Sequence, residues 1–225
     1  MTPIVVLRAP ERAAATLAAI AAAGGEAIAH PLFALVPLAW QRPPNAFDAL
    51  ALTSANAVTL AGAGLDACRD LPAWAVGAAT AHAAQAAGLT VAHVGDAGAA
   101  RLFEAMRMAG VRRGLWLAAE DRAIDPPAWI DAVAVYRAEP LAHADAAAVA
   151  GRVVLVHSAR AAAQLAGLLD IAARRGTALV AISAAAAAAA GPGWRSIDIA
   201  ARPDDAAIVA AAIDRARAPS DKQRQ

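Results

Sequence analysis

The sequence predicts an α/β protein made of two three-layer domains, each a parallel sheet covered by helices, with one domain inserted into the other. Two observations lead to this prediction. Short apolar runs alternate with longer stretches of helical character, and proline-containing segments near residues 35 and 138 interrupt the alternation. Strands that alternate with helices form parallel sheets, because each helix returns the chain to the same end of the sheet.

The expected elements follow in chain order. The first third has strands at 4–7 and 27–30 around a helix at 11–23 that two glycines terminate. The middle has strands at 49–52, 73–76, 91–94, 115–117 and 130–136, with helices at 55–63, 78–87 and 99–109. The last third has strands at 153–156, 178–182 and 196–199, with helices at 159–174, 184–190 and 204–217.

The prolines give the domain boundaries. Domain one is expected to comprise residues 1–34 and 141–217, and the inserted domain two residues 40–134. Residues 35–39 and 135–140 would link them, and the polar segment 218–225 would form a frayed tail.

An internal repeat supports two related domains. Leu52–Val58 parallels Val156–Ala162, and Ala75–Ala81 parallels Ala181–Ala187 at nearly the same spacing. Because matched serines fall in matched strand contexts, duplication explains the similarity better than alanine-rich composition does.

Composition excludes several classes of function. The net charge of +1 and the 4% aromatic content argue against nucleic-acid binding. The 60% apolar fraction is largely alanine, and no run reaches the roughly 20 residues that cross a membrane. Without a basic, apolar leader, the chain is expected to be cytoplasmic.

The single cysteine, Cys68, excludes an intrachain disulfide and a cysteine zinc site, and the histidines show no ligand motif. Nucleotide-loop and nucleophile-elbow motifs are missing.

Three strand-to-helix turns carry the candidate binding groups. Thr53-Ser54-Ala55-Asn56, the turn from Gly77 to Thr80, and Ser158-Ala159 each place a strand end beside a helix N-terminus. Backbone N–H groups and the helix dipole there favour an anion, and such turns line the ligand crevice of open α/β sheets. The alternative for each serine or threonine is an ordinary helix cap.

Tyr136 is the candidate for side-chain chemistry. It is the only tyrosine and ends an extended segment beside the second linker, where its phenol could donate a hydrogen bond or a proton to a leaving group. The alternative is a half-buried strand tyrosine. The carboxylates of Glu120-Asp121-Arg122 could serve acid/base work, but a solvated loop explains them better.

The residues resemble the uroporphyrinogen-III synthase family over nearly the whole chain. The matching pieces occur in the family's order: Arg8-Ala9-Pro10, Pro31-Leu32, Phe47 to Val58, Ala75 to Ala81, Val135-Tyr136-Arg137, and His157-Ser158-Ala159-Arg160.

The resemblance implies two α/β domains joined by a two-stranded linker, and a cofactor-free lyase reaction. Hydroxymethylbilane, a linear tetrapyrrole with many carboxylates, would lose its hydroxyl and close to uroporphyrinogen III with ring D inverted. Positioning would decide the product, because the chemistry without enzyme yields the unrearranged isomer. The family's tyrosine corresponds to Tyr136. Substrate-binding positions correspond to Arg8, Thr53, Ser54, Ala55, Asn56, Gly77, Thr80, Ser158 and Ala159. A monomer is expected, with possible transient contact with the upstream deaminase.

Two departures from the family pattern stand out. Ser183, Ala185 and Ala186 replace the Gly and Thr pair of the second turn, which removes hydroxyl contacts there. The segment between Arg122 and Tyr136 is too short for the family's helix and is expected to be a loop. An inactive paralogue and a non-catalytic binder of a polycarboxylate are the alternatives.

Overall fold

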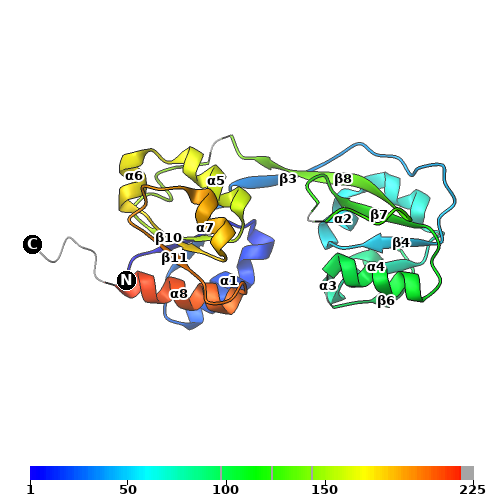
Figure 1. Ribbon diagram of the computed structural model, residues 1–225, viewed down its shortest axis with the longest axis horizontal. Coiled ribbons are helices and arrows are strands. Elements are labelled where there is room, and N and C mark those ends of the chain that lie inside the picture. The colour runs from blue at the N-terminus through cyan, green and yellow to red at the C-terminus, as the bar shows by residue number, and fades with distance from the viewer. Residues whose placement is uncertain (97, 123, 143, 219–225) are drawn as a thin grey trace, which may run out of the picture. The chain divides into compact units, whose positions relative to one another are not determined.

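The computed structural model describes residues 1–96, 98–122, 124–142 and 144–218. The chain divides into two compact units, Met1–Ala34 with Pro140–Gln225 (unit 1) and Leu35–Glu139 (unit 2) (Figure 1). Each unit is a sheet with helices on both faces, so the predicted α/β class with one domain inserted into the other is confirmed. Apart from Ala218, the tail expected at 218–225 lies outside the described residues.

Unit 1 is built on a parallel five-stranded sheet with the order β11-β10-β9-β1-β2. Its strands are β1 (Ile4–Val6), β2 (Ala27–Ala29), β9 (Val153–Val156), β10 (Ala178–Ala181) and β11 (Ser196–Ile199). Its helices are α1 (Pro10–Ala22), α5 (Ala159–Leu168), α6 (Ile171–Gly176), α7 (Ala184–Ala190) and α8 (Asp205–Arg217).

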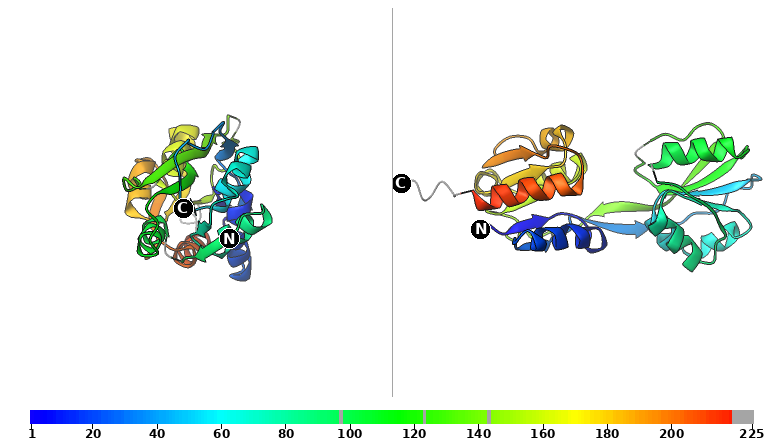
Figure 2. Two further views of the ribbon diagram at one scale, coloured as in Figure 1. Left: turned by 90° about the vertical axis from the view of Figure 1, so that its right-hand side faces the viewer. Right: turned by 90° about the horizontal axis from the view of Figure 1, so that it is seen from below.

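Alternate residues of the central strands point to opposite faces of this sheet. Ile4 and Leu155 pack with α1 and α8, whereas Val5 and Val154 pack with α5 and α7. Both α1 and α8 lie in front of the sheet in the right-hand view of Figure 2. The central strands are buried on both faces, which is why they read as uninterrupted apolar runs.

Unit 2 is built on a six-stranded sheet with the order β3-β8-β7-β4-β5-β6. Its strands are β3 (Phe33–Pro37), β4 (Ala49–Leu52), β5 (Ala73–Ala75), β6 (Val91–Val94), β7 (Gly114–Ala119) and β8 (Ile130–Pro140). Its helices are α2 (Ala55–Leu60), the 3-10 helix η1 (Gly62–Cys68), α3 (Ala78–Ala86) and α4 (Gly98–Met108). α2, η1 and α3 cover one face, and α4 covers the other.

The edge strand β3 of this sheet is antiparallel to its neighbour β8. The Leu38 N–H donates to the Val135 carbonyl, and the Leu141 N–H donates to the Leu32 carbonyl, so residue numbers rise along β3 as they fall along β8. The other neighbouring strands are parallel. Both boundaries between the units fall inside β3 and β8, so the chain leaves and re-enters unit 1 along paired strands.

The two sheets correspond strand by strand, although the chain runs through them differently. β6-β5-β4-β7-β8 of unit 2 matches β11-β10-β9-β1-β2 of unit 1, and the extra strand is β3. In unit 1 the last two matching strands come from the N-terminus of the chain. The Thr2 N–H donates to the Ala216 carbonyl at 2.9 Å, which puts the start of β1 beside the end of α8. The repeat is therefore visible in sequence only where both units keep the same chain order.

Some expected elements differ in extent. The helix expected at 159–174 is two helices, because Asp170 caps α6 by accepting from the Ala173 N–H at 2.7 Å. The helix expected at 55–63 ends at Leu60, and Gly62 at φ 61° begins η1. The strand expected at 130–136 continues to Pro140. As the short spacing predicts, no helix occurs between β7 and β8 within residues 120–122 and 124–129.

Candidate functional site

The carboxyl end of β4 leads directly into α2, and its hydroxyl side chains are already engaged. Ser54 is the N-cap of α2, and its Oγ accepts from the Asn56 N–H at 3.2 Å. The Thr53 Oγ1 accepts from the Trp116 Nε1–H at 2.9 Å. Ser54 is thus a helix cap, as the alternative interpretation held, and each hydroxyl still has its own hydrogen to donate to an anionic ligand. Ala55 and Asn56, in the first turn of α2, are half-buried.

The neighbouring strand β5 leads into α3 through a turn of another kind. Gly77 is the N-cap, and α3 has no side-chain cap. Ala78 and Ala79 are exposed, whereas Thr80 is buried with 5% of its surface accessible. The first-turn amides of α3 therefore have no side-chain acceptor, and the helix dipole adds positive potential to them.

Tyr136 lies on the same edge of the same sheet. It pairs in register with Ala119 at the end of β7, and its carbonyl accepts from the Glu120 N–H at 2.9 Å. The half-buried ring packs against the core that α2 and α3 cover. Glu120, Asp121 and Arg122 are exposed, in agreement with the solvated-loop interpretation. In unit 2, Thr53, Ser54 and Gly77 thus lie at the carboxyl ends of β4 and β5, and Tyr136, which is inside β8, lies beside the carboxyl end of β7.

Serines cap two of the helices that begin at the corresponding edge of unit 1. Ser158 caps α5 by accepting from the Ala161 N–H at 3.1 Å, and Ser183 caps α7 by accepting from the Ala186 N–H at 3.3 Å. Ser158 and Ala159 are exposed at this edge.

The alanine at position 186 removes less of the binding surface than the comparison with the family pattern suggests. Ala186 is 1% exposed, and its counterpart Thr80 is also buried. The hydroxyl missing at 186 therefore belongs to a position that faces the interior in both units, and the exposed Ala185 matches the equally exposed Ala79.

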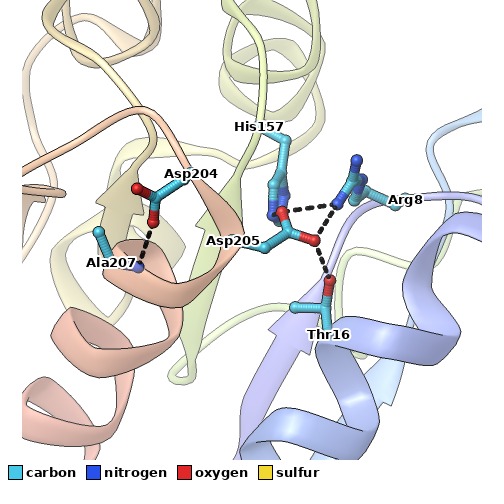
Figure 3. A network of polar contacts seen from close by, with 6 residues as sticks. All are labelled: Arg8, Thr16, His157, Asp204, Asp205 and Ala207. Atoms are coloured by element: carbon cyan, nitrogen blue, oxygen red, sulfur yellow. Dashed lines mark hydrogen bonds and ion pairs between the residues drawn. The ribbon is translucent and has the colours of Figure 1, made fainter. Parts of the chain in front are cut away.

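A polar network that sequence reasoning missed surrounds Arg8 at the same edge of unit 1 (Figure 3). The Arg8 Nη1 donates to both carboxylate oxygens of Asp205, at 2.9 and 3.0 Å. The Thr16 Oγ1 donates to the Asp205 Oδ2 at 3.3 Å, and the His157 Nε2 lies 3.6 Å from the Asp205 Oδ1. Asp205 therefore stands at the centre of the network.

The imidazole of His157 is buried and uncharged. Its side chain is 9% exposed, and neither ring nitrogen has a hydrogen-bond partner among the described residues. Burial first, and then the charge of Arg8, lower the pKa of His157 to about 4, although Asp205 acts in the opposite direction.

Only part of this network had a sequence signal. Arg8 was expected from the family resemblance, and His157 lies inside the repeated strand end. Asp205 follows the Asp204 helix cap in the sequence, and nothing local indicates that it meets Arg8, 197 positions away. Within the described residues, no group of three or more histidines, cysteines or acids could hold a metal ion, and no helix is long and apolar enough to span a membrane.

The architecture defines a class of protein: a two-unit α/β protein whose polar groups collect at the edges where the parallel strands of its two sheets end. Comparison with known proteins specifies the class further. The family model of uroporphyrinogen-III synthase HemD matches residues 14–210. The chain belongs to the uroporphyrinogen-III synthase family, a family of enzymes of tetrapyrrole biosynthesis. The resemblance of the sequence motifs to that family is thereby confirmed, and uroporphyrinogen-III synthesis is the function that this match supports.

One solved structure supports the fold. The uroporphyrinogen-III synthetase of Helicobacter pylori matches with a TM-score of 0.62 at 18% identity, over 95% of this chain and 99% of that one. A uroporphyrinogen III synthase of Thermus thermophilus matches with a TM-score of 0.41 at 15% identity, over 96% of this chain and 99% of that one. The comparison with curated proteins found no significant match.

Proposed function

We propose that the chain is a cytoplasmic, monomeric, cofactor-free lyase that converts hydroxymethylbilane to uroporphyrinogen III. The observation that carries this proposal is the uncapped N-terminus of α3 on the edge that also holds Tyr136. Free first-turn amides are suited to carboxylates, which this substrate carries in number. Acid/base side chains are sparse on this edge within the described residues, which fits a reaction directed mainly by substrate positioning.

The proposed chemistry begins with loss of the substrate hydroxyl. The Tyr136 phenol donates a hydrogen bond to the departing oxygen; the hydroxyl leaves as water together with the N–H proton of the pyrrole that carries it, which yields an azafulvene. The substituted carbon of ring D then attacks the azafulvene, and the spiro intermediate fragments and recloses with ring D inverted. Tyr136 is suited to this role because β8 holds it half-buried, and none of the described residues accepts a hydrogen bond from its hydroxyl.

Carboxylates of the substrate would be held by turns at the strand ends. In unit 2 the proposed contacts are the amides after Gly77 and the turn Thr53-Ser54-Ala55-Asn56. In unit 1 they are Arg8 and the turn Ser158-Ala159. Thr80 is proposed to support the α3 turn from the inside, because its side chain is buried.

The activity is tested by generating hydroxymethylbilane in situ with the upstream deaminase and separating the oxidised products. With the protein present, isomer III should dominate, and without it isomer I should form. Isomer I alone in both samples would overturn the proposal. Tyr136→Phe should lower turnover and leave the melting temperature nearly unchanged.

The role of the α3 amides has a sharper test in Gly77. Its φ of −178° is accessible to any residue, and a Cβ there meets nothing within 4 Å. Gly77→Ser should supply the cap that Ser183 gives α7, occupy a first-turn amide and raise KM with little loss of stability. Gly77→Ala adds the same Cβ without an acceptor and is the matched control. Equal KM values for the two variants would contradict carboxylate binding at this turn.

We also propose that units 1 and 2 correspond to domains at 1–34 with 141–217 and at 40–134, linked by 35–39 and 135–140.

The deaminase is proposed to contact the chain transiently and to deliver the substrate to the same turns at the strand ends. Light scattering of the purified chain tests the monomer, and pull-down with the deaminase tests the contact.

A further inference from the structure

Four residues from three separate parts of the sequence meet at the carboxyl edge of the unit 1 sheet. Arg8 follows β1 and His157 follows the adjacent strand β9, while Thr16 comes from α1 and Asp205 from the first turn of α8 (Figure 3). The proposed function uses only Arg8 of these four and leaves the other three unexplained.

We propose that Asp205 is a positioning residue that holds Arg8 at this edge, and that Arg8 and His157 together form a subsite for a substrate carboxylate. This inference rests on the proposed function, because the ligand it names is a carboxylate of the linear tetrapyrrole. Asp205 and Thr16 do not touch the ligand and act through Arg8.

The geometry of Arg8 leaves donors for a ligand. Both bonds to Asp205 use Nη1, and among the described residues no acceptor bonds Nη2 or Nε, so both remain for a second carboxylate. The side chain is 26% exposed, so a ligand can reach it. A guanidinium presents a rigid fork that binds a carboxylate through two parallel N–H groups, and fixing one nitrogen fixes the orientation of that fork.

Thr16 restrains the carboxylate in turn. Thr16, in α1, is 1% exposed, and its hydroxyl donates to the Asp205 Oδ2. Asp205 is therefore held from α1 as well as by its own helix, and its oxygens give Arg8 a fixed reference.

His157 supplies the second, independent observation. Its side chain is more than nine-tenths buried, and both ring nitrogens are without hydrogen-bond partners among the described residues. The 3.6 Å between Nε2 and the Asp205 Oδ1 is too long for a hydrogen bond. An unpaired buried polar group is unfavourable, and a ligand oxygen that reaches the imidazole N–H beside Arg8 would relieve it.

The test compares wild-type protein with Asp205→Asn and Asp205→Glu. Asp205→Asn removes the charge that holds Arg8 and should raise KM about tenfold or more while kcat changes little. Asp205→Glu keeps the charge and should recover part of the loss. Asp214→Asn changes the same residue type at the other end of α8, where no described residue bonds its carboxylate, and should leave KM unchanged.

Two further measurements separate positioning from a structural role. Melting temperatures show whether α8 has lost stability. The Kd of uroporphyrinogen III, measured anaerobically by calorimetry, should rise with KM in Asp205→Asn and in His157→Phe.

The outcomes are distinguishable from failure of the proposed function. If the wild type forms isomer III but Asp205→Asn keeps the wild-type KM and Kd, the subsite is wrong and the function stands. If Asp205→Glu melts like the wild type yet recovers neither constant, Asp205 does not position Arg8. If the wild type forms only isomer I, the proposed function fails. In that case the Kd of uroporphyrinogen III alone tests the subsite, and equal Kd values for the wild type, Asp205→Asn and His157→Phe would overturn the subsite proposal.

Discussion

Acidification should destabilise unit 1 through His157, and His157→Gln should remove that part of the acid sensitivity. The pKa of His157 is about 4 in the folded protein, against 6.5 for an ordinary histidine. As pH falls below 6.5, the unfolded chain takes up the proton and the folded chain does not, so the equilibrium shifts toward unfolding. The stability is fully present above pH 6.5 and is lost as pH falls to about 4.

The size of the effect follows from the difference between the two pKa values. At about 1.4 kcal/mol per pH unit, the interval from 6.5 to about 4 corresponds to about 3 kcal/mol. Burial is the main cause and Arg8 the second, so the effect depends on keeping the imidazole in place rather than on a single ion pair.

Urea unfolding at pH 7 and at pH 4.5, followed by circular dichroism, measures this quantity. The wild type should lose about 2 to 3 kcal/mol more than His157→Gln between the two pH values, because other titrating groups cancel in the comparison. NMR of the histidine rings gives the pKa directly. His82 is exposed in α3, and His82→Gln is the matched control that should behave like the wild type. An NMR midpoint above pH 6 for His157, or parallel losses in wild type and His157→Gln, would refute the reasoning.

Three further substitutions test backbone conformation and hydrogen bonds within the two units. Gly191 ends α7 at φ 64° and ψ −171°, a conformation nearly restricted to glycine. Gly191→Ala should therefore lower the free energy of unfolding in urea by about 1–3 kcal/mol, and an unchanged midpoint would contradict this. Ser183→Ala removes the acceptor for the Ala186 N–H and should cost about 1 kcal/mol, and no loss would show that the cap is not needed. Thr53→Val leaves the N–H of the buried Trp116 unpaired and should cost about 1–3 kcal/mol, measured in the same way; a stabilised variant would argue against that hydrogen bond.

Local pattern alone predicted most elements of this fold. The strands at 91–94, 153–156 and 196–199 and the helix at 184–190 were predicted with their observed bounds, because strand and helix periodicities and turn residues act over a few neighbouring positions. The serine turns were predicted for the same reason, since a strand end followed by Ser is a local signal for a helix N-cap. The family, too, followed from motifs that are short and contiguous.

Tertiary structure decided how those pieces share space. The placement of β1 between β9 and β2, and of β3 beside β8, depends on contacts between segments far apart in the chain, which carry no local pattern. The same holds for the burial of Thr80, which a strand-to-helix motif places in a turn without showing which way it faces.

Arg8 shows the division between sequence and structure most clearly. The sequence determined that a polar residue follows the first strand and that a helix begins after Asp204. Only the folded sheet brought Arg8 to the carboxylate of Asp205, 197 positions away, because parallel strands align their carboxyl ends whatever their order in the chain.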